Sequence, residues 1–185
     1  MRSQHYLVPQ HDEGTSTDLE YRATSPTLED AEDGFVAAKD ALLDVNSWAK
    51  LLVPTVHVHL ADAHGKPVSR SARRGDHLCL DSGSPDHDYE WVLIESLEYD
   101  DYPDELKETF AMRLHAVAAP GQPATATFTE EASGTLVVER LGRTLHTLYH
   151  WRDRGDEHLS RTGLWHSISN DQWLTIITAL IDANA

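Results

Sequence analysis

The segment from Phe35 to Leu60 constrains the fold more than any other part of the chain, because its hydrophobic period changes along its length. Its first half places apolar residues at steps of three and four, the spacing of one face of a helix. These residues are Phe35, Ala38, Leu42, Val45, Ala49 and Leu52. After Pro54 the apolar residues alternate strictly through Val56, Val58 and Leu60, which is typical of a half-buried strand. The segment therefore predicts an amphipathic helix that leads directly into the sheet that it covers.

The start and the end of this helix are marked by its own residues. Thr27 is expected to cap it, and the acidic residues that follow, such as Asp30, lie where the helix dipole favours negative charge. Pro54 ends it, since the residue before a proline is disfavoured in helical geometry. We expect a break into two pieces near Gly34 or Asn46.

The chain between Pro54 and about residue 154 has the pattern of strands separated by turn residues. The expected strands are 55–62, 76–81, 90–99, 109–118, 135–141 and 144–151, the last two forming a hairpin around Gly142. A closing amphipathic helix is expected over residues 169–182. Residues 1–27 form either a loose arm or an edge strand. Strands grouped between terminal helices predict an α+β fold, with about six or seven mostly sequential antiparallel strands and helices on one face.

Composition excludes several classes of partner. Fifteen basic and 31 acidic residues give a formal net charge of −16, whereas binding to nucleic acid or to an anionic membrane surface needs clustered lysine and arginine. Cys79 is the only cysteine, so we expect no disulfide and no cysteine-based zinc site, and its apolar neighbours predict an inert, half-buried thiol. No apolar run resembles a signal peptide or a membrane span, so we expect a cytoplasmic protein.

Several segments together carry a resemblance to a known superfamily. In ALLDVNSWAKLLVPTVHVHL a helix with the pattern Asp44-x-x-x-Trp48 enters the sheet, RRGDHLCLD and DYEWVLIESLE supply paired strands, and SISNDQWLTIITALID supplies the last helix. These segments resemble the START-like, helix-grip superfamily that includes the polyketide cyclases and SRPBCC proteins. The resemblance implies one α+β domain over residues 28–185, with a curved antiparallel sheet wrapped around a helix and an apolar pocket between them. Members of that superfamily bind lipids, isoprenoids, polyketides or other apolar molecules, and a minority catalyse reactions on them.

Aromatic residues on several expected strands are the candidates for lining such a pocket. Arg113 and His115 alternate with Phe110, Met112 and Leu114 along one strand, so they become polar anchors only if their face is the inner one. The candidate ligand-binding residues are Trp91, Phe110, Met112, Arg113, His115, Tyr149, Trp151 and Trp173. For each aromatic residue taken alone, filling the core is the simpler interpretation.

Histidines and glycines give no metal or cofactor motif. His57 and His59 share one face of an expected strand, and a His-x-His pair can bind zinc. They occupy the polar phase of the alternation, however, and no carboxylate-rich partner motif follows at a fixed spacing, so we predict no metal site. The glycines form neither a phosphate-binding loop nor a dinucleotide fingerprint, and no nucleophile lies in a recognisable motif. We therefore predict no cofactor and name no catalytic residue.

Three kinds of function fit the sequence. The first is a module that binds a small apolar or amphipathic molecule. The second is an enzyme of the cyclase or aromatase type that uses a histidine or an acid, such as His115 or Glu95, for proton transfer. The third is a non-catalytic interaction protein whose acidic surface docks a basic partner. No pattern in the sequence specifies the ligand or an oligomeric state.

Overall fold

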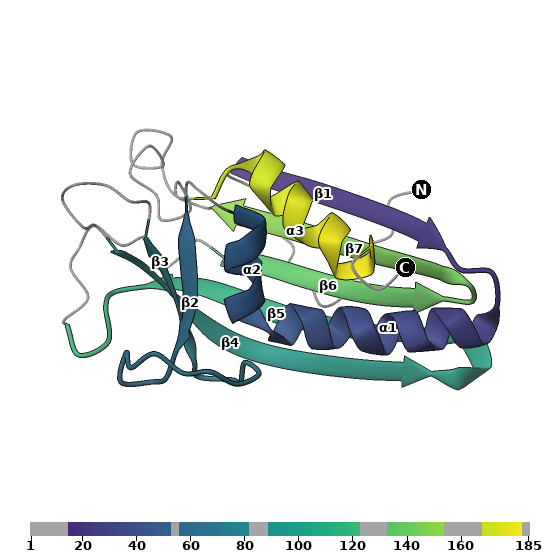
Figure 1. The fold of residues 1–185 in the computed structure, drawn as a ribbon, viewed down its shortest axis with the longest axis horizontal. Coiled ribbons are helices and arrows are strands. Elements are labelled where there is room, and N and C mark those ends of the chain that lie inside the picture. Colours follow the sequence, from purple (N-terminus) through teal and green to yellow (C-terminus); the bar gives the residue numbers. More distant parts are fainter. Residues whose placement is uncertain (1–14, 53–55, 82–88, 123–132, 154–167, 183–185) are drawn as a thin grey trace.

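The computed structural model describes residues 15–52, 56–81, 89–122, 133–153 and 168–182 (Figure 1). The strands are β1 (Thr15–Thr24), β2 (His57–Ala61), β3 (His77–Asp81), β4 (Tyr89–Tyr102), β5 (Lys107–Val117), β6 (Ser133–Leu141) and β7 (Thr144–Asp153). The helices are α1 (Leu28–Leu43), α2 (Val45–Leu52) and α3 (Asn170–Asp182), with one 3-10 turn, η1 (Pro103–Glu105).

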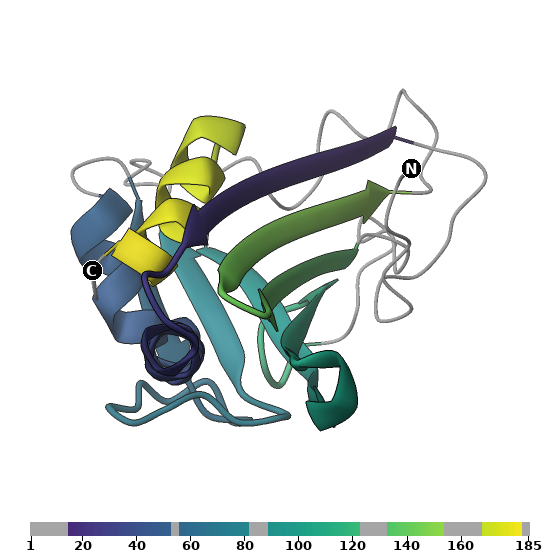
Figure 2. The same cartoon turned by 90° about the vertical axis from the view of Figure 1, so that its right-hand side faces the viewer.

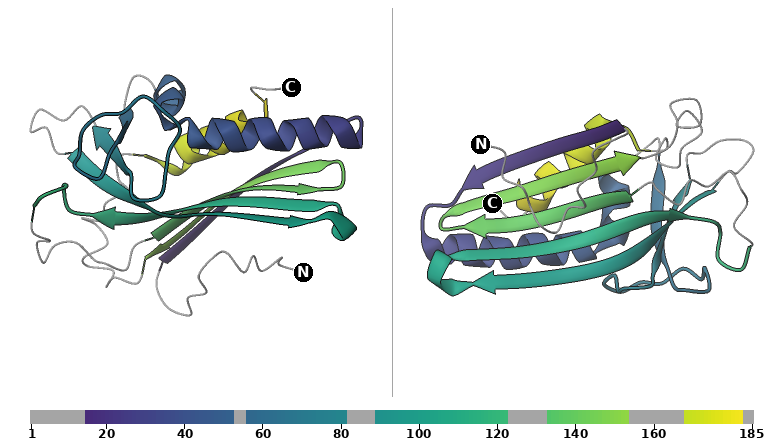
Figure 3. Two further views of the ribbon diagram at one scale, coloured as in Figure 1. Left: turned by 90° about the horizontal axis from the view of Figure 1, so that it is seen from below. Right: turned by 180° about the vertical axis from the view of Figure 1, so that it is seen from behind.

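The described strands form one open sheet in which every neighbouring pair is antiparallel. Their order is β1-β7-β6-β5-β4-β3-β2, so β1 and β2 are the edges. The helices lie on one face of this sheet, and α1 runs along its length (Figure 3). We call this face the inner face and the opposite one the outer face. The predicted α+β class, with mostly sequential antiparallel strands, is confirmed.

The long helix predicted after Thr27 is two helices. A capping box opens α1: the backbone N–H of Asp30 donates to Thr27 Oγ1 at 3.0 Å, and the Asp30 carboxylate accepts from the Thr27 N–H at 3.2 Å. The break lies at Asp44, the C-cap of α1. There the Trp48 indole N–H donates to the Ala41 carbonyl oxygen at 3.2 Å, which satisfies a carbonyl in the last turn of α1. The Asp-x-x-x-Trp pattern is therefore the joint between the two helices.

Of the two positions expected for the break, the structure selects the one near Asn46. Gly34 lies inside α1, where an added Cβ would come within 2.7 Å of Leu145 Cδ1 on β7. The glycine therefore lets the helix approach the sheet closely. The predicted helix end at Pro54 lies outside the described residues.

Residues 100–102 lie between two of the expected strands, 90–99 and 109–118, but in the structure they are part of a strand. Asp100 to Tyr102 continue β4 and pair with Lys107 to Thr109 of β5. The chain then turns through η1 and Leu106, which has a φ of 51° in the left-handed region. Because this turn is tight, the two strands of the hairpin pair almost up to the turn and extend beyond their expected ends.

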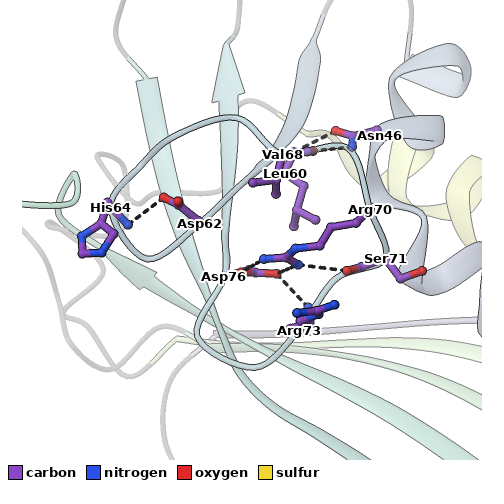
Figure 4. A network of polar contacts seen from close by, with 9 residues as sticks. All are labelled: Asn46, Leu60, Asp62, His64, Val68, Arg70, Ser71, Arg73 and Asp76. Carbon is purple, nitrogen blue, oxygen red and sulfur yellow. Dashed lines mark hydrogen bonds and ion pairs between the residues drawn. The ribbon is translucent and has the colours of Figure 1, made fainter.

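A polar side chain fixes the connection between β2 and β3 against α2 (Figure 4). The Asn46 amide donates to the Val68 carbonyl oxygen at 2.9 Å and accepts from the Leu60 backbone N–H at 3.0 Å. One side chain thus joins the helix, the strand and the loop that follows it.

Asp76 is a buried acceptor in the same connection, with 5% of its surface exposed (Figure 4). The Arg70 guanidinium donates two hydrogen bonds to its carboxylate at 2.6 and 2.9 Å, and the Arg73 backbone N–H donates a third at 2.8 Å. Burial alone would raise the pKa of Asp76, but these donors outweigh it and hold that pKa below its ordinary value. The ionised carboxylate therefore contributes stability above the unfolded-state pKa of about 3.9, and this contribution is lost as the pH falls through the lower folded-state pKa.

We expect Asp76→Asn to lower the free energy of unfolding by about 2 kcal/mol near neutral pH, because a neutral amide bonds the guanidinium of Arg70 more weakly. Urea unfolding of both proteins near neutral pH and at about pH 2 measures this loss. The difference between the two proteins should shrink at the lower pH, because protonation of Asp76 there removes part of the charge that Arg70 pairs with. An equal loss at both pH values would contradict the ionised pair as its cause.

Candidate ligand-binding site

Three aromatic side chains from three elements meet on the inner face. Tyr149 of β7 and Trp173 of α3 are stacked, with ring centroids 4.3 Å apart and planes inclined by 13°. Trp48 of α2 meets Trp173 edge-on, with centroids 6.4 Å apart and planes at 76°. Each of the three is at most 2% exposed. This aromatic cluster joins the last helix both to the sheet and to the helix pair, where the pocket was expected.

Other candidate residues continue the lining from the aromatic cluster along the inner face. Met112 of β5 is fully buried, and Phe110 of the same strand is 7% exposed. Trp151 is the next inward-facing residue after Tyr149, and it packs half-buried against the same core. Burial raises the pKa of Tyr149, so its hydroxyl stays neutral. The candidates that share the inner face are Phe110, Met112, Tyr149, Trp151 and Trp173.

The remaining three candidates lie on the outer face. Arg113 and His115 alternate with the buried inward-facing residues of β5, and Arg113 Nε lies 4.0 Å from the Glu95 carboxylate. Trp91 of β4 packs edge-on against His77, with ring centroids 6.3 Å apart. Because the sheet separates its two faces, these three side chains do not share a site with the aromatic cluster.

The inner face also carries an ion pair whose two residues are not among the candidate ligand-binding residues. Arg140 of β6 is 5% exposed and donates through Nε to the Glu108 carboxylate of β5 at 2.6 Å. The Tyr99 hydroxyl donates to the same carboxylate at 3.0 Å, and partial burial together with this bond raises the pKa of Tyr99 to about 12. Phe35 of α1 approaches the Tyr99 ring, with centroids 6.3 Å apart. These residues give one end of the inner face a polar character.

The sequence does contain a signal for Arg140. It follows Leu136 and Val138 at steps of two, which places it in the buried phase of its strand. A buried arginine is costly unless a partner compensates it, so this phase alone predicts a paired carboxylate nearby. Glu108 is that partner.

Comparisons with known proteins show the architecture and not the ligand. No family model and no curated protein matches the chain. Among solved structures, hypothetical protein jhp0584 from Helicobacter pylori is similar over 100% of this chain and 99% of that chain, with a TM-score of 0.59 and 11% identity. A second match is truncated norcoclaurine synthase from Thalictrum flavum, with a TM-score of 0.44 and 7% identity over 95% of this chain and 97% of that chain. A third is Ara h 8.0201, with a TM-score of 0.42 and 11% identity over 92% of this chain and 98% of that chain. The likeness to the Helicobacter pylori structure shows a shared fold, and the open antiparallel sheet with helices on one face is a helix-grip arrangement.

The described part of the helix-grip domain offers no metal centre. His57 and His59 lie together on the outer face of β2, and burial lowers the pKa of His59 although the Asp81 carboxylate opposes it. No three His, Cys, Asp or Glu side chains among the described residues come together in a way that could hold a metal ion. Cys79 is buried, and burial followed by the nearby Asp81 charge raises its pKa to about 11, which agrees with an inert thiol.

Charged and polar side chains on the outer face of the helix-grip domain form a second network. Arg22 of β1 donates through Nε to His146 Nε2 at 3.1 Å, and Lys107 Nζ lies 3.1 Å from the Glu139 carboxylate. His146 and Glu139 are each 8% exposed, and their nearest polar atoms lie 3.9 Å apart. Since each buried charge has a partner, we interpret this network as structural. No described helix is long and apolar enough to cross a membrane.

Proposed function

We propose that this helix-grip domain binds a small apolar or amphipathic molecule between the inner face of its sheet and α3. The observation that carries the proposal is the aromatic cluster of Trp48, Tyr149 and Trp173, which comes from three elements and is shielded from water. Such rings offer flat, polarizable surfaces to an apolar ligand. Met112 lies in the same row of the sheet as Tyr149, with Leu136 between them, and adds a side chain that adapts its shape.

The polar end of the inner face supports an amphipathic ligand. The pairing of Arg140 with Leu145 places the ion pair of Arg140 and Glu108 four residues along β7 from Tyr149, or about 13 Å at the usual rise of a strand. An elongated molecule with its polar group at one end matches this division of the face.

The cyclase or aromatase alternative has less support. Its proton-transfer candidates are not on the inner face: His115 lies on the outer face, and Glu95 is exposed at the bulge of β4. Tyr149, which does face inward, has a raised pKa and stays protonated near neutral pH. A general acid or base works best with a pKa near the working pH, so the binding function is favoured over catalysis.

The test is a fluorescence titration with 8-anilinonaphthalene-1-sulfonate, followed through both the probe and the tryptophan emission. We expect saturable binding that Tyr149→Leu weakens at least about tenfold, because the variant loses the ring stacked on Trp173. Leu148→Met changes the neighbouring residue, whose side chain lies on the outer face, and should leave the affinity unchanged. Circular dichroism checks that both variants fold.

Native mass spectrometry of the purified protein supplies the second readout. A co-purifying apolar molecule that is present in the wild type and lost in Tyr149→Leu would support the proposal. The proposal is wrong if no apolar molecule co-purifies and the probe fails to saturate. It is also wrong if Tyr149→Leu and Leu148→Met bind the probe equally well.

A further inference from the structure

A different surface lies at the end of the sheet where the β4–β5 and β6–β7 turns come together, the end that faces the viewer in Figure 2. Tyr102, Leu106 and Leu141 are 38%, 46% and 56% exposed there. Lys107 pairs with Tyr102 on one side and with Leu141 on the other, and the Gly142 N–H donates to the Leu106 carbonyl oxygen at 2.9 Å. The three exposed residues therefore occupy adjoining positions, and we call them the apolar tip.

Leu106 has a backbone conformation that leucine rarely adopts. Its φ of 51° and ψ of 40° are left-handed, which is unfavourable for any residue with a Cβ and easy for glycine. The neighbouring turn gives a direct comparison, because Gly142 has a similar φ of 56° and is a glycine. Leu106 is the only non-glycine residue with positive φ in the described part of the chain. An exposed leucine thus stands where a glycine would be more stable, which points to a role for its side chain outside the fold.

Acidic residues outnumber the cations around the apolar tip, although Arg143 is exposed on the β6–β7 turn, where it donates to the Pro26 carbonyl oxygen at 2.9 Å. Asp101, Asp104 and Glu105 are exposed, and none of them forms an ion pair with another described residue. Lys107, the cation between the tip residues, is already paired with Glu139 at 3.1 Å. A second copy of the chain would bring the same carboxylates and a further charge of −16, and anionic lipid or nucleic acid would be repelled as well. The partner that complements this surface is cationic.

We propose that the apolar tip docks a protein segment in which lysine or arginine residues flank large aliphatic side chains. The aliphatic side chains would cover Leu106 and Leu141, and the cations would face Asp101, Asp104 and Glu105. Burial of apolar surface supplies the affinity, while charge selects the partner. The apolar tip lies outside the proposed ligand site between the sheet and α3, so this proposal and the ligand-binding proposal can fail separately.

The test titrates the full chain with two synthetic peptides, acetyl-LKKLLKKLLKKL-amide and acetyl-LEELLEELLEEL-amide, by isothermal titration calorimetry. We expect the cationic peptide to bind and the anionic peptide not to bind. Leu106→Gly should weaken binding at least about tenfold, and it should fold at least as stably as the wild type because glycine relieves the left-handed strain. Loss of binding in this variant therefore cannot come from unfolding.

Two further variants separate the tip from the general acidity of the protein. The double variant Asp104→Asn with Glu105→Gln should weaken binding, and Leu174→Ser, which changes an exposed leucine on α3, should leave it unchanged. The proposal is overturned if the cationic peptide does not bind, or if the anionic peptide binds equally well. Unchanged binding in Leu106→Gly would also overturn it, as would a tip that proves to drive self-association in sedimentation or to bind phosphatidylglycerol vesicles.

Discussion

Trp173→Ala is expected to lower the free energy of unfolding by about 4 kcal/mol. Trp173 is 1% exposed, and its ring is in contact with Tyr149 on one side and Trp48 on the other. Truncation removes the ring stack and leaves a large cavity between α3 and the sheet. Two hydrogen bonds also hold α3 to the sheet: the Thr147 hydroxyl donates to the Ile177 carbonyl oxygen at 2.7 Å, and the Tyr21 hydroxyl donates to the Asp182 carboxylate at 2.8 Å. Each such hydrogen bond contributes only about 1 kcal/mol, so they cannot replace the lost packing.

Urea unfolding measures this loss, and the adjacent position on α3 provides the control. Leu174 is 40% exposed, so Leu174→Ala should change the free energy of unfolding by no more than about 0.5 kcal/mol. Trp173→Phe should fall between the two, since a smaller ring can still stack on Tyr149. If Trp173→Ala cost less than about 1 kcal/mol, or no more than Leu174→Ala, the aromatic cluster would not be what holds α3 on the sheet.

The spacing of apolar residues in the sequence predicted the helices and strands, because a residue's position within a helix or strand decides whether its side chain is buried. The change of period between Phe35 and Leu60 predicted a helix leading into a strand, and the structure has α1, α2 and β2 there. The same logic would have located Arg140, since its phase is that of Val138. Local patterns of this kind are sufficient to predict which side chains are buried wherever burial follows the regular spacing of a single helix or strand.

The assignment of Trp91 shows where a strict alternation fails. Without a bulge, Trp91 would share its face with Leu97, because side chains an even number of positions apart on a strand point to the same face. The register of β4 against β5 shifts between Ile94 and Ser96, so Trp91 lies on the outer face and Leu97 on the inner one. Nothing in the local residues marks this bulge, which arises from the pairing of two long strands.

The aromatic cluster depends on the whole fold and not on any local pattern. Trp48, Tyr149 and Trp173 lie far apart in the chain, and each one alone has the pattern of a core residue. They meet because α2 follows α1 across the inner face and α3 packs against β7. The sequence could nominate Tyr149 and Trp173 as candidates, but the contact with Trp48 follows only from the topology.

Arg140→Met is expected to lower the free energy of unfolding by about 3 kcal/mol, because it leaves the Glu108 carboxylate without its strongest donor. The hydrogen bond between Arg140 Nε and Glu108 is 2.6 Å long, and the side chains are 6% and 16% exposed. The Tyr99 hydroxyl is a further donor to this carboxylate, but it carries no charge. The cost therefore comes mainly from the uncompensated charge of Glu108, since methionine fills much of the volume of the arginine stem.

Removing both charges should recover most of this loss. We expect the double variant of Arg140→Met with Glu108→Leu to unfold within about 1 kcal/mol of the wild type, because an apolar pair can replace a buried ion pair at little cost. Arg143→Met, on the turn of the same hairpin, loses an exposed hydrogen bond to the Pro26 carbonyl and should cost less than about 1 kcal/mol. Urea unfolding of these three variants and of Glu108→Leu alone completes the double-mutant cycle. A double variant as unstable as the single one would mean that the arginine stem packs in a way methionine cannot reproduce, and that the charge of Glu108 is not the source of the loss.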